Sequence, residues 1–142
     1  MKIRTLKKTD IKKASRIIGQ NYSKLYEKKS LLELEAMFKN HAVIPNYLVV
    51  EEKEEIVGLA GYVQSWMDYN IYEIFWVNVL PQYQRMGIGT MLVKKILNII
   101  KKSNSEATIL LTTDKPMFYS KKFNFKILST FEKAKEYLMV LK

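Results

Sequence analysis

One stretch of the chain, residues 71–90, constrains the fold more than any other. Residues 71–79 are largely apolar and rich in Ile, Val and aromatic residues, which are typical of a buried β-strand. Pro81 then marks a turn, and two glycines, Gly87 and Gly89, precede a segment whose apolar residues recur at helical spacing. The stretch therefore predicts a strand, a tight loop and a helix in direct succession, as in α/β folds.

The start of that helix is suited to bind an anion. The first backbone N–H groups of a helix have no partner within it, and the helix dipole places partial positive charge there. A phosphate or pyrophosphate fits this position, and Gly87 and Gly89 have no Cβ to hinder its approach. We expect the helix to span Gly87–Lys101, with Ile96 and Ile100 on its apolar face.

Two common phosphate-binding motifs do not fit this loop. A dinucleotide-binding fingerprint requires a third Gly or Ala three residues after Gly89, where this chain has Leu92. A P-loop requires Gly-Lys-Ser/Thr, which the sequence does not contain. A glycine loop that caps a helix without binding a ligand remains a further interpretation.

Composition limits the class of protein. With 142 residues and 48% hydrophobic content, the chain is long enough for one domain over residues 1–142. No run approaches the roughly 18 apolar residues that span a bilayer, so we expect a cytoplasmic protein with no membrane partner. The chain has no cysteine, and His41 is its one histidine and is interpreted as a loop residue. Neither a metal site nor a Ser-His-Asp triad is therefore expected.

The net charge of +10 is unevenly distributed along the chain. Residues 1–30 and 76–142 are rich in Lys and Arg, whereas residues 31–75 have an excess of acids. A basic region around the glycine loop suits a nucleotide with phosphate groups and would equally suit a nucleic acid. Each individual lysine is also consistent with an ordinary solvated surface.

The remaining elements follow from apolar periodicity and capping residues. Six strands or helices are expected before the glycine loop and four after its helix, in a chain without repeats or linkers. They are strand Met1–Thr5, a helix capped by Thr9 or Asp10, a helix from the capping box Ser30–Glu33 to Asn40, the hairpin Tyr47–Glu52 and Ile56–Trp66, strand Ile71–Val79, strand Ala107–Thr113, a helix capped by Asp114 that ends at Tyr119, and strands Lys126–Thr130 and Tyr137–Leu141.

Three features together resemble the GNAT superfamily of N-acetyltransferases. The segment Gln84-x-x-Gly87-x-Gly89 resembles the acetyl-CoA signature of that superfamily, and the order of the expected elements is similar over the whole chain. Residues 56–61 look like its third strand, and residues 118–125 look like its late Phe-Tyr-x-x-x-Leu-Gly-Phe segment. Here Asn124 replaces the usual Gly and tolerates the same left-handed backbone. Thr112 stands where many members have Asn.

The resemblance implies an α/β (α+β) fold with a mixed, mostly antiparallel central sheet of about seven strands flanked by about four helices. It implies acetyl-CoA as co-substrate and no metal. The residues that it implies for binding acetyl-CoA surround the glycine loop and are Val77, Asn78, Val79, Gln84, Arg85, Met86, Gly87, Ile88, Gly89 and Thr90.

The resemblance also implies the chemistry, which is acetyl transfer to a primary amine of a small molecule or a protein. Without cysteine, direct attack in a ternary complex is expected. Backbone N–H groups around Val77 to Val79 would bind the carbonyl oxygen. Tyr119 would protonate the departing thiolate, and Glu73 would act as the base. The alternatives are a packing role for Tyr119 and an exposed strand start for Glu73.

A second function from another class is a non-catalytic basic module that binds nucleic acid or CoA. The nine tyrosines of the chain form no recognisable RNA-binding motif, so nucleic acid is not an expected partner. If the chain is an enzyme, Tyr22, Tyr26, Trp66 and Tyr69 are candidates to line the acceptor pocket. The net charge predicts a preference for weakly charged amines over polyamines. Edge strands of this fold often pair, so a homodimer is expected by analogy.

Overall fold

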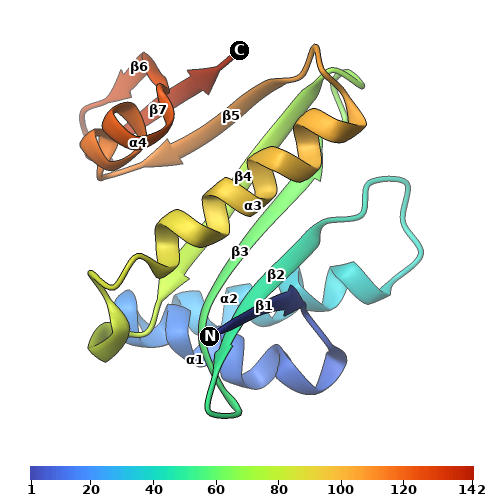
Figure 1. Cartoon of the computed structure of the whole chain (residues 1–142), viewed down its shortest axis with the longest axis vertical. Coiled ribbons are helices and arrows are strands. Elements are labelled where there is room, and N and C mark those ends of the chain that lie inside the picture. Colours follow the sequence, from blue (N-terminus) through green and yellow to red (C-terminus); the bar gives the residue numbers. More distant parts are fainter.

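The strands form one open sheet in the computed structural model, which describes residues 1–142 (Figure 1). They are β1 (Lys2–Thr5), β2 (Asn46–Glu52), β3 (Glu55–Gln64), β4 (Ile71–Val79), β5 (Thr108–Thr113), β6 (Lys126–Phe131) and β7 (Glu136–Leu141). Their order across this 7-stranded sheet is β1-β2-β3-β4-β5-β7-β6, and every neighbouring pair except β4 and β5 is antiparallel. The predicted fold class is confirmed.

Helices cover both faces of the sheet. They are α1 (Ile11–Asn21), α2 (Lys24–Glu35), α3 (Ile88–Ser103) and α4 (Pro116–Phe123), with short 3-10 turns at Lys8–Asp10, Ala36–Phe38 and Pro81–Tyr83. In Figure 1, α3 crosses in front of the sheet, whereas α1 and α2 lie behind it.

Strand β2 shows how the two faces are buried. Its successive side chains alternate between two hydrophobic clusters. Tyr47 and Val49 pack with residues of α1 and α2, and Leu48 and Val50 pack with residues of α3. A strand that is buried on both faces has a continuous apolar run, which is the pattern that the sequence shows here.

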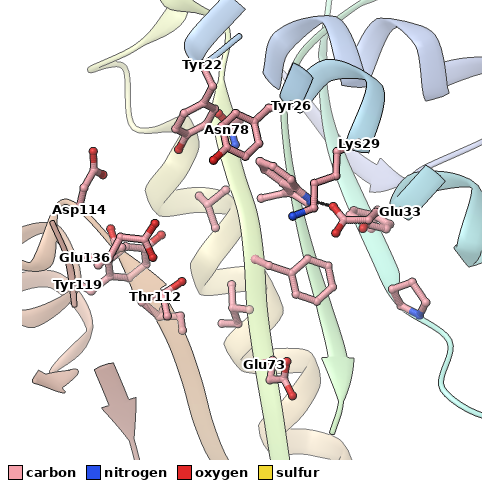
Figure 2. Close-up of a pocket in the computed structure, with 18 of the residues that line it drawn as sticks. Tyr22, Tyr26, Lys29, Glu33, Glu73, Asn78, Thr112, Asp114, Tyr119 and Glu136 are labelled. Atoms are coloured by element: carbon pink, nitrogen blue, oxygen red, sulfur yellow. Dashed lines mark hydrogen bonds between the residues drawn. The ribbon is translucent and has the colours of Figure 1, made fainter. Parts of the chain in front are cut away.

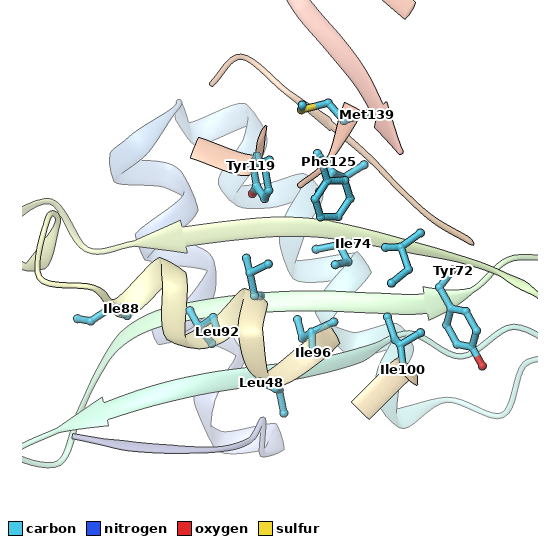
Figure 3. Packing of buried hydrophobic residues seen from close by; sticks show 14 of the residues in the cluster. Leu48, Tyr72, Ile74, Ile88, Leu92, Ile96, Ile100, Tyr119, Phe125 and Met139 are labelled. Atoms are coloured by element: carbon cyan, nitrogen blue, oxygen red, sulfur yellow. The ribbon is translucent and has the colours of Figure 1, made fainter. Parts of the chain in front are cut away.

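Helix α3 packs on the sheet through one apolar stripe. The buried residues of the stripe are Ile88, Leu92, Val93, Ile96 and Ile100, most of which Figure 3 labels. Burial of one such side chain contributes roughly 2 kcal/mol to the stability of the fold. Tyr119 and Phe125 belong to the same buried cluster, so the core extends from α3 to α4 (Figure 3). The cluster thereby fixes the N-terminus of α3 relative to Tyr119.

Strands β4 and β5 lie side by side only at one end. They pair in parallel where Ile71–Glu73 meets Thr108–Leu110, and no further pairs follow. Beyond Glu73 the two strands diverge (Figure 1). We refer to the region between the separated strands as the β4–β5 opening.

A β-bulge lies in β4 beside this opening. Trp76 and Val77 together face the single residue Ala60 of β3. Trp76 has a φ of 50°, a left-handed backbone conformation that is uncommon for a bulky residue. The extra residue of a bulge is left out of the strand ladder, so backbone groups become free at the opening.

The predicted start of the second helix is wrong. Helix α2 begins at Lys24, because the extended residue before it is Ser23, whose hydroxyl accepts a hydrogen bond from the Tyr26 N–H at 3.3 Å. Ser30 lies buried inside the helix, and its hydroxyl donates to the carbonyl of Glu27 at 2.7 Å. The helix ends at Glu35, and the turn Ala36–Phe38 follows in place of a continuation to Asn40.

Asp10 occupies the predicted position before α1 but does not cap it with its side chain, and the predicted cap of α4 is wrong. Asp10 makes no side-chain cap to α1, because its carboxylate accepts from the Lys7 N–H at 2.8 Å and pairs with Arg4 at 2.7 Å. Asp114 does not cap α4, which begins at Pro116 and continues past Tyr119 to Phe123. The left-handed backbone expected at Asn124 is confirmed, with a φ of 64°.

Strand β6 forms one edge of the sheet and is exposed along its whole length. Its large apolar side chains Ile127, Leu128 and Phe131 are all solvent-accessible. No helix of the structure is both long and apolar enough to cross a bilayer.

Candidate functional site

Two pockets lie at the β4–β5 opening and meet there. The first, which we call the glycine-loop groove, has a volume of about 700 Å³ and is lined mainly by residues between 77 and 90 and between 113 and 122. The second, which we call the aromatic pocket, has a volume of about 780 Å³ and lies between α2, β4, β5 and the start of β7 (Figure 2). Six residues line both pockets: Tyr22, Val77, Asn78, Thr113, Asp114 and Tyr119.

The groove brings together nine of the ten residues that the sequence implies for binding acetyl-CoA. They are Val77, Asn78, Val79, Gln84, Arg85, Gly87, Ile88, Gly89 and Thr90. Met86 does not line the groove, and its side chain is 57% exposed. The side chain of Ile88 is buried in the core, so this residue offers only its backbone to the groove.

The loop backbone has the geometry of an anion site. The first helical hydrogen bond of α3 runs from the Met91 N–H to the Gly87 carbonyl at 3.0 Å, so the N–H groups between these residues have no helical acceptor. Gly87 has a φ of 83°, and a Cβ added there would meet no atom within 4 Å. A Cβ on Gly89 would lie 3.6 Å from the Phe118 ring, an ordinary contact distance. Gly87 therefore faces open space, and Gly89 has room for no more than ordinary van der Waals contact with its neighbours.

Three side chains of the groove are positively charged: Arg85, Lys115 and Lys122. The Lys122 ammonium also lies 5.9 Å from the centre of the Phe118 ring. Lys115 immediately precedes α4 and Lys122 lies in its last turn, and no motif in the sequence singles them out. Together with the dipole of α3, these side chains favour a ligand with phosphate groups.

A hydrogen-bond network connects the loop to the end of β4. The Asn21 amide nitrogen donates to the Asn78 side-chain oxygen and to the Val79 carbonyl, both at 3.0 Å. The Gln84 amide nitrogen donates to the same Val79 carbonyl at 3.0 Å and to the Asn21 side-chain oxygen at 3.2 Å. Asn21, the last residue of α1, was not predicted from the sequence, because only the fold brings it to the loop.

Tyr119 lies where the two pockets meet. The residue is only 7% exposed, and its hydroxyl has no hydrogen-bond partner within the protein. Since no fully enclosed side-chain oxygen or nitrogen of the protein lacks a partner, this hydroxyl reaches the space of the pockets. Burial, followed by the nearby Tyr22 and Asp114, raises the pKa of Tyr119 above its ordinary value. The phenol therefore keeps its proton at neutral pH.

Glu73 lines the aromatic pocket at the closed end of the β4–β5 opening. It is the last residue of β4 that pairs with β5, and its side chain is exposed to the pocket. In Figure 2, Glu73 lies on β4 toward one end of the pocket, and Tyr119 lies across the opening. The two predicted catalytic residues therefore share one pocket, but they do not form a hydrogen bond with each other.

The walls of the aromatic pocket come from opposite sides of the opening (Figure 2). Tyr22 and Tyr26 lie on one side, and their rings contact Trp76 with centroids 6.2 Å apart in both pairs. These two tyrosines line the pocket, as the sequence analysis predicts. Trp66 and Tyr69 do not line it, and the prediction for them is wrong, because both lie exposed in the loop between β3 and β4.

Acidic residues from four separate parts of the chain also line this pocket. They are Glu33 of α2, Glu73 of β4, Asp114 after β5 and Glu136 of β7. The Glu33 carboxylate accepts a hydrogen bond from the Trp76 indole N–H (Figure 2). Except for Glu73, none of these acids was predicted from the sequence, because no local pattern shows that distant segments meet here.

Comparisons with known proteins agree with this geometry. The model of a family described as acetyltransferase (GNAT) family matches residues 11–125. No curated protein matches the sequence. A GNAT-family protein of Desulfovibrio desulfuricans has a similar structure, with a TM-score of 0.87 at 13% identity, covering 99% of this chain and 98% of that chain.

Two further similar structures contain coenzyme A. One is an aminoglycoside 6'-N-acetyltransferase, with a TM-score of 0.79 at 18% identity, covering 99% of this chain and 96% of that chain. The other is the PaiA N-acetyltransferase of Thermoplasma acidophilum, with a TM-score of 0.75 at 20% identity, covering 99% of this chain and 98% of that chain. At these identities the likeness shows the shared fold.

Proposed function

The chain belongs to the acetyltransferase (GNAT) family, and from that premise we propose that it is an acetyl-CoA-dependent N-acetyltransferase that acts on a primary amine. One observation carries the proposal. A basic groove with a free helix N-terminus and an acidic, aromatic pocket meet beside the buried, protonated phenol of Tyr119, with the half-buried Tyr22 also lining both. Such a cavity can hold an anionic donor and a cationic acceptor on opposite sides of one proton donor.

The residues of the groove fit acetyl-CoA. Gly87 and Gly89 leave room for a pyrophosphate at the N-terminus of α3, and Arg85, Lys115 and Lys122 add positive charge around it. When bound, acetyl-CoA supplies an acetyl group activated as a thioester. The bulge at Trp76 and Val77 leaves backbone groups free, and an N–H there would stabilise negative charge on the acetyl oxygen.

Tyr119 is proposed as the general acid. Its hydroxyl is unpartnered, opens into both pockets and is protonated at neutral pH, and burial raises its pKa further. A phenol in that state can donate its proton to sulfur as the carbon–sulfur bond breaks. The buried cluster around α4 holds the ring in place, so the donor is oriented before the substrates bind.

Glu73 is proposed as the base that receives the proton of the amine. Its carboxylate faces the aromatic pocket from β4 and forms no ion pair with the protein. The bulge lies only a few residues further along β4, at a rise of about 3.3 Å per residue, so one or more waters in the pocket would connect Glu73 to the amine. The absence of cysteine, the most nucleophilic acyl carrier, supports direct attack in a ternary complex over a covalent intermediate.

A CoA-release assay with acetyl-CoA and a panel of amines, peptides and basic proteins tests this function. We expect release that depends on both the acceptor and Tyr119. Binding of CoA without release for any acceptor would favour the alternative, a CoA-binding module. Binding of nucleic acid in place of CoA would favour the basic nucleic-acid module, with the glycine loop holding a backbone phosphate.

A homodimer and a cytoplasmic location are part of the same proposal. The exposed apolar side chains of the edge strand β6 support self-association, since an unpaired strand edge can pair with a second copy. Light scattering of the purified chain tests this, and Leu128→Lys should yield a monomer. A dimer that persists in this variant would contradict pairing through β6.

A further inference from the structure

The aromatic pocket has a charge opposite to that of the protein. The chain carries a net charge of +10, yet Glu33, Glu73, Asp114 and Glu136 line this pocket against the single basic residue Lys29. The ion pairs of the protein lie elsewhere, at β1, β2 and the N-terminus, and involve none of these four acids. The negative charge of the pocket is therefore not neutralised by salt bridges within the protein.

One end of the pocket combines negative charge with aromatic faces. Tyr22, Tyr26 and Trp76 form a cluster in which each ring contacts the other two, with centroids 5.7 to 6.2 Å apart. The Trp76 indole donates to the Glu33 carboxylate, which fixes this acid beside the cluster. A carboxylate next to aromatic faces is an environment that binds organic ammonium groups.

Tyr47 provides an independent observation at the same end. The residue is 1% exposed, lines the pocket, and has a hydroxyl without a hydrogen-bond partner within the protein. Because no fully enclosed polar side-chain atom lacks a partner, this hydroxyl reaches the pocket space. Burial, followed by the nearby charge of Glu33, raises the pKa of Tyr47. A buried phenol that reaches the pocket without a partner can accept a hydrogen bond from a ligand.

We propose that the acceptor carries at least two amino groups, and that Glu33, Tyr47 and Trp76 hold the amino group that does not react. This inference rests on the proposed function and names its substrate class. The held nitrogen stays an ammonium ion, donates to the Glu33 carboxylate and the Tyr47 hydroxyl, and lies against Trp76. The reacting amine lies beside Tyr119 at the other side of the opening.

The reaction itself involves only the second nitrogen. The neutral amine forms a bond to the acetyl carbon, the carbon–sulfur bond breaks, the amine proton passes to Glu73 through water, and Tyr119 gives its proton to the sulfur. The held ammonium keeps its proton and its charge throughout. It serves to position the substrate, and its contribution therefore appears mainly in KM.

The proposal replaces the expectation, drawn from the net charge, that weakly charged amines are preferred over polyamines. Surface lysines act over distance and are screened beyond about 8 Å at physiological salt. The four acids act at contact, within a pocket that is partly shielded from solvent. Local charge therefore outweighs net charge in the choice of acceptor.

The test compares acceptors that differ by one amino group. The kcat/KM values of diaminobutane, diaminopentane and diaminohexane are measured against those of butylamine, pentylamine and hexylamine, and kanamycin represents rigid amino sugars. We expect at least one diamine to exceed its monoamine about tenfold or more, mainly through KM. A kcat/KM for kanamycin above that of every diamine would also support an acceptor with at least two amino groups, and would indicate an amino sugar. Equal values for all pairs and for kanamycin would overturn the proposal.

Variants locate the effect. Glu33→Gln should lower the ratio of the diamine kcat/KM to the monoamine kcat/KM about tenfold, the loss expected for a charged hydrogen bond. Tyr47→Phe should lower the same ratio about threefold, the loss expected for a neutral hydrogen bond. Glu35→Gln removes the same charge from the same helix outside the pocket and should keep the ratio. An unchanged ratio in Glu33→Gln would overturn the assignment of the second amino group.

Calorimetry separates this proposal from the proposed function. The protein with CoA bound is titrated with diaminopentane and with pentylamine. If no amine releases CoA, the proposed function fails, yet tighter binding of the diamine that is lost in Glu33→Gln still supports the second amino-group site. Equal binding of the two amines overturns it, whether or not the chain is an enzyme.

Discussion

The amide nitrogen of Gln84 donates a hydrogen bond to the backbone carbonyl of Val79 across 3.0 Å. The same nitrogen donates to the Asn21 side chain at 3.2 Å, so both of its hydrogens are used within the protein. In this structure Gln84 therefore connects the glycine loop to the end of β4 and to α1, and only its oxygen remains free for a ligand. We infer that Gln84 positions the loop.

Replacement of Gln84 by Leu should weaken CoA binding about tenfold, because two hydrogen bonds worth about 1 kcal/mol each no longer hold the loop. Calorimetry with CoA measures the effect. Gln82→Leu is the matched control, since Gln82 is an exposed residue in the preceding turn and lines neither pocket. Equal CoA affinity in both variants would show that Gln84 does not position the loop.

Gly89→Ala should abolish tight CoA binding without loss of stability. The new methyl group meets the Phe118 ring only at a normal contact distance, but it occupies space where we place the phosphates. Alanine also has a higher helix propensity than glycine, by up to about 1 kcal/mol. We expect CoA affinity to fall at least about tenfold, while urea unfolding shows equal or higher stability. Unchanged affinity would contradict the assignment of the groove.

Gly87→Ala separates backbone strain from ligand contact. The φ of 83° at this position is unfavourable for any residue with a Cβ, so the variant should lose about 1 kcal/mol of unfolding free energy. Gly89→Ala, which lies two residues away, provides the comparison, because no positive φ is required there. Equal stability of the two variants would mean that the loop relaxes in solution.

The sequence predicted the site where its signal is local. The order of strands and helices, the glycine loop and the left-handed Asn124 each depend on a few neighbouring residues. The start of α2 was missed because Ser30 and Glu33 resemble a capping box, whereas Ser23, with no such pair, is the residue that caps the helix. A cap depends on where the preceding chain turns, and tertiary packing decides this.

The acceptor side was not predicted, for a different reason. Glu33, Tyr47 and Glu136 lie far apart in the sequence and line one pocket only because β4 and β5 separate. None of these three residues stands out from its sequence neighbours by a motif or an unusual residue type. Glu73, which lines the same pocket, was singled out in the sequence because a carboxylate interrupts an apolar strand, which is a local signal.

Tyr119→Phe should lower the rate of the chemical step and leave acetyl-CoA affinity nearly unchanged. General acid catalysis typically contributes about a hundredfold or more, and the hydroxyl acts only as the thiolate leaves. Single-turnover measurements should show this loss, with the dissociation constant of acetyl-CoA within about threefold of the parent. Tyr137→Phe is the control, because Tyr137 lies on β7 outside both pockets. An unchanged chemical step would remove Tyr119 from the mechanism.

Gly61→Ala should destabilise the floor of the aromatic pocket. A Cβ on Gly61 would lie 2.6 Å from ring atoms of both Tyr47 and Phe75, whose rings pack edge to face with centroids 5.7 Å apart. Overpacking of this kind costs roughly 1–3 kcal/mol. Urea unfolding of Gly61→Ala beside Gly89→Ala measures the cost, and equal stability of the two variants would show that the rings move freely.

The pH dependence of stability provides the last test, since it depends on the buried phenol of Tyr47. Burial and the nearby Glu33 raise the pKa of Tyr47 above the value of about 10 that an unfolded tyrosine has. Below pH 10 both states hold the proton, so Tyr47 adds no pH dependence. Above pH 10 the unfolded state loses the proton first, and the free energy of unfolding falls by up to about 1.4 kcal/mol per pH unit for this residue.

Tyr47→Phe cannot ionise, so its unfolding free energy should fall less steeply than that of the parent above pH 10. The difference between the two proteins should be constant at neutral pH and should shift in favour of the variant as the solution becomes alkaline. Taking this difference cancels the contribution of the lysines, which both proteins share. Urea unfolding between neutral pH and about pH 11 measures it. Parallel curves throughout would mean that Tyr47 ionises equally in the folded and unfolded chain, and that its hydroxyl is not held in a buried site beside Glu33.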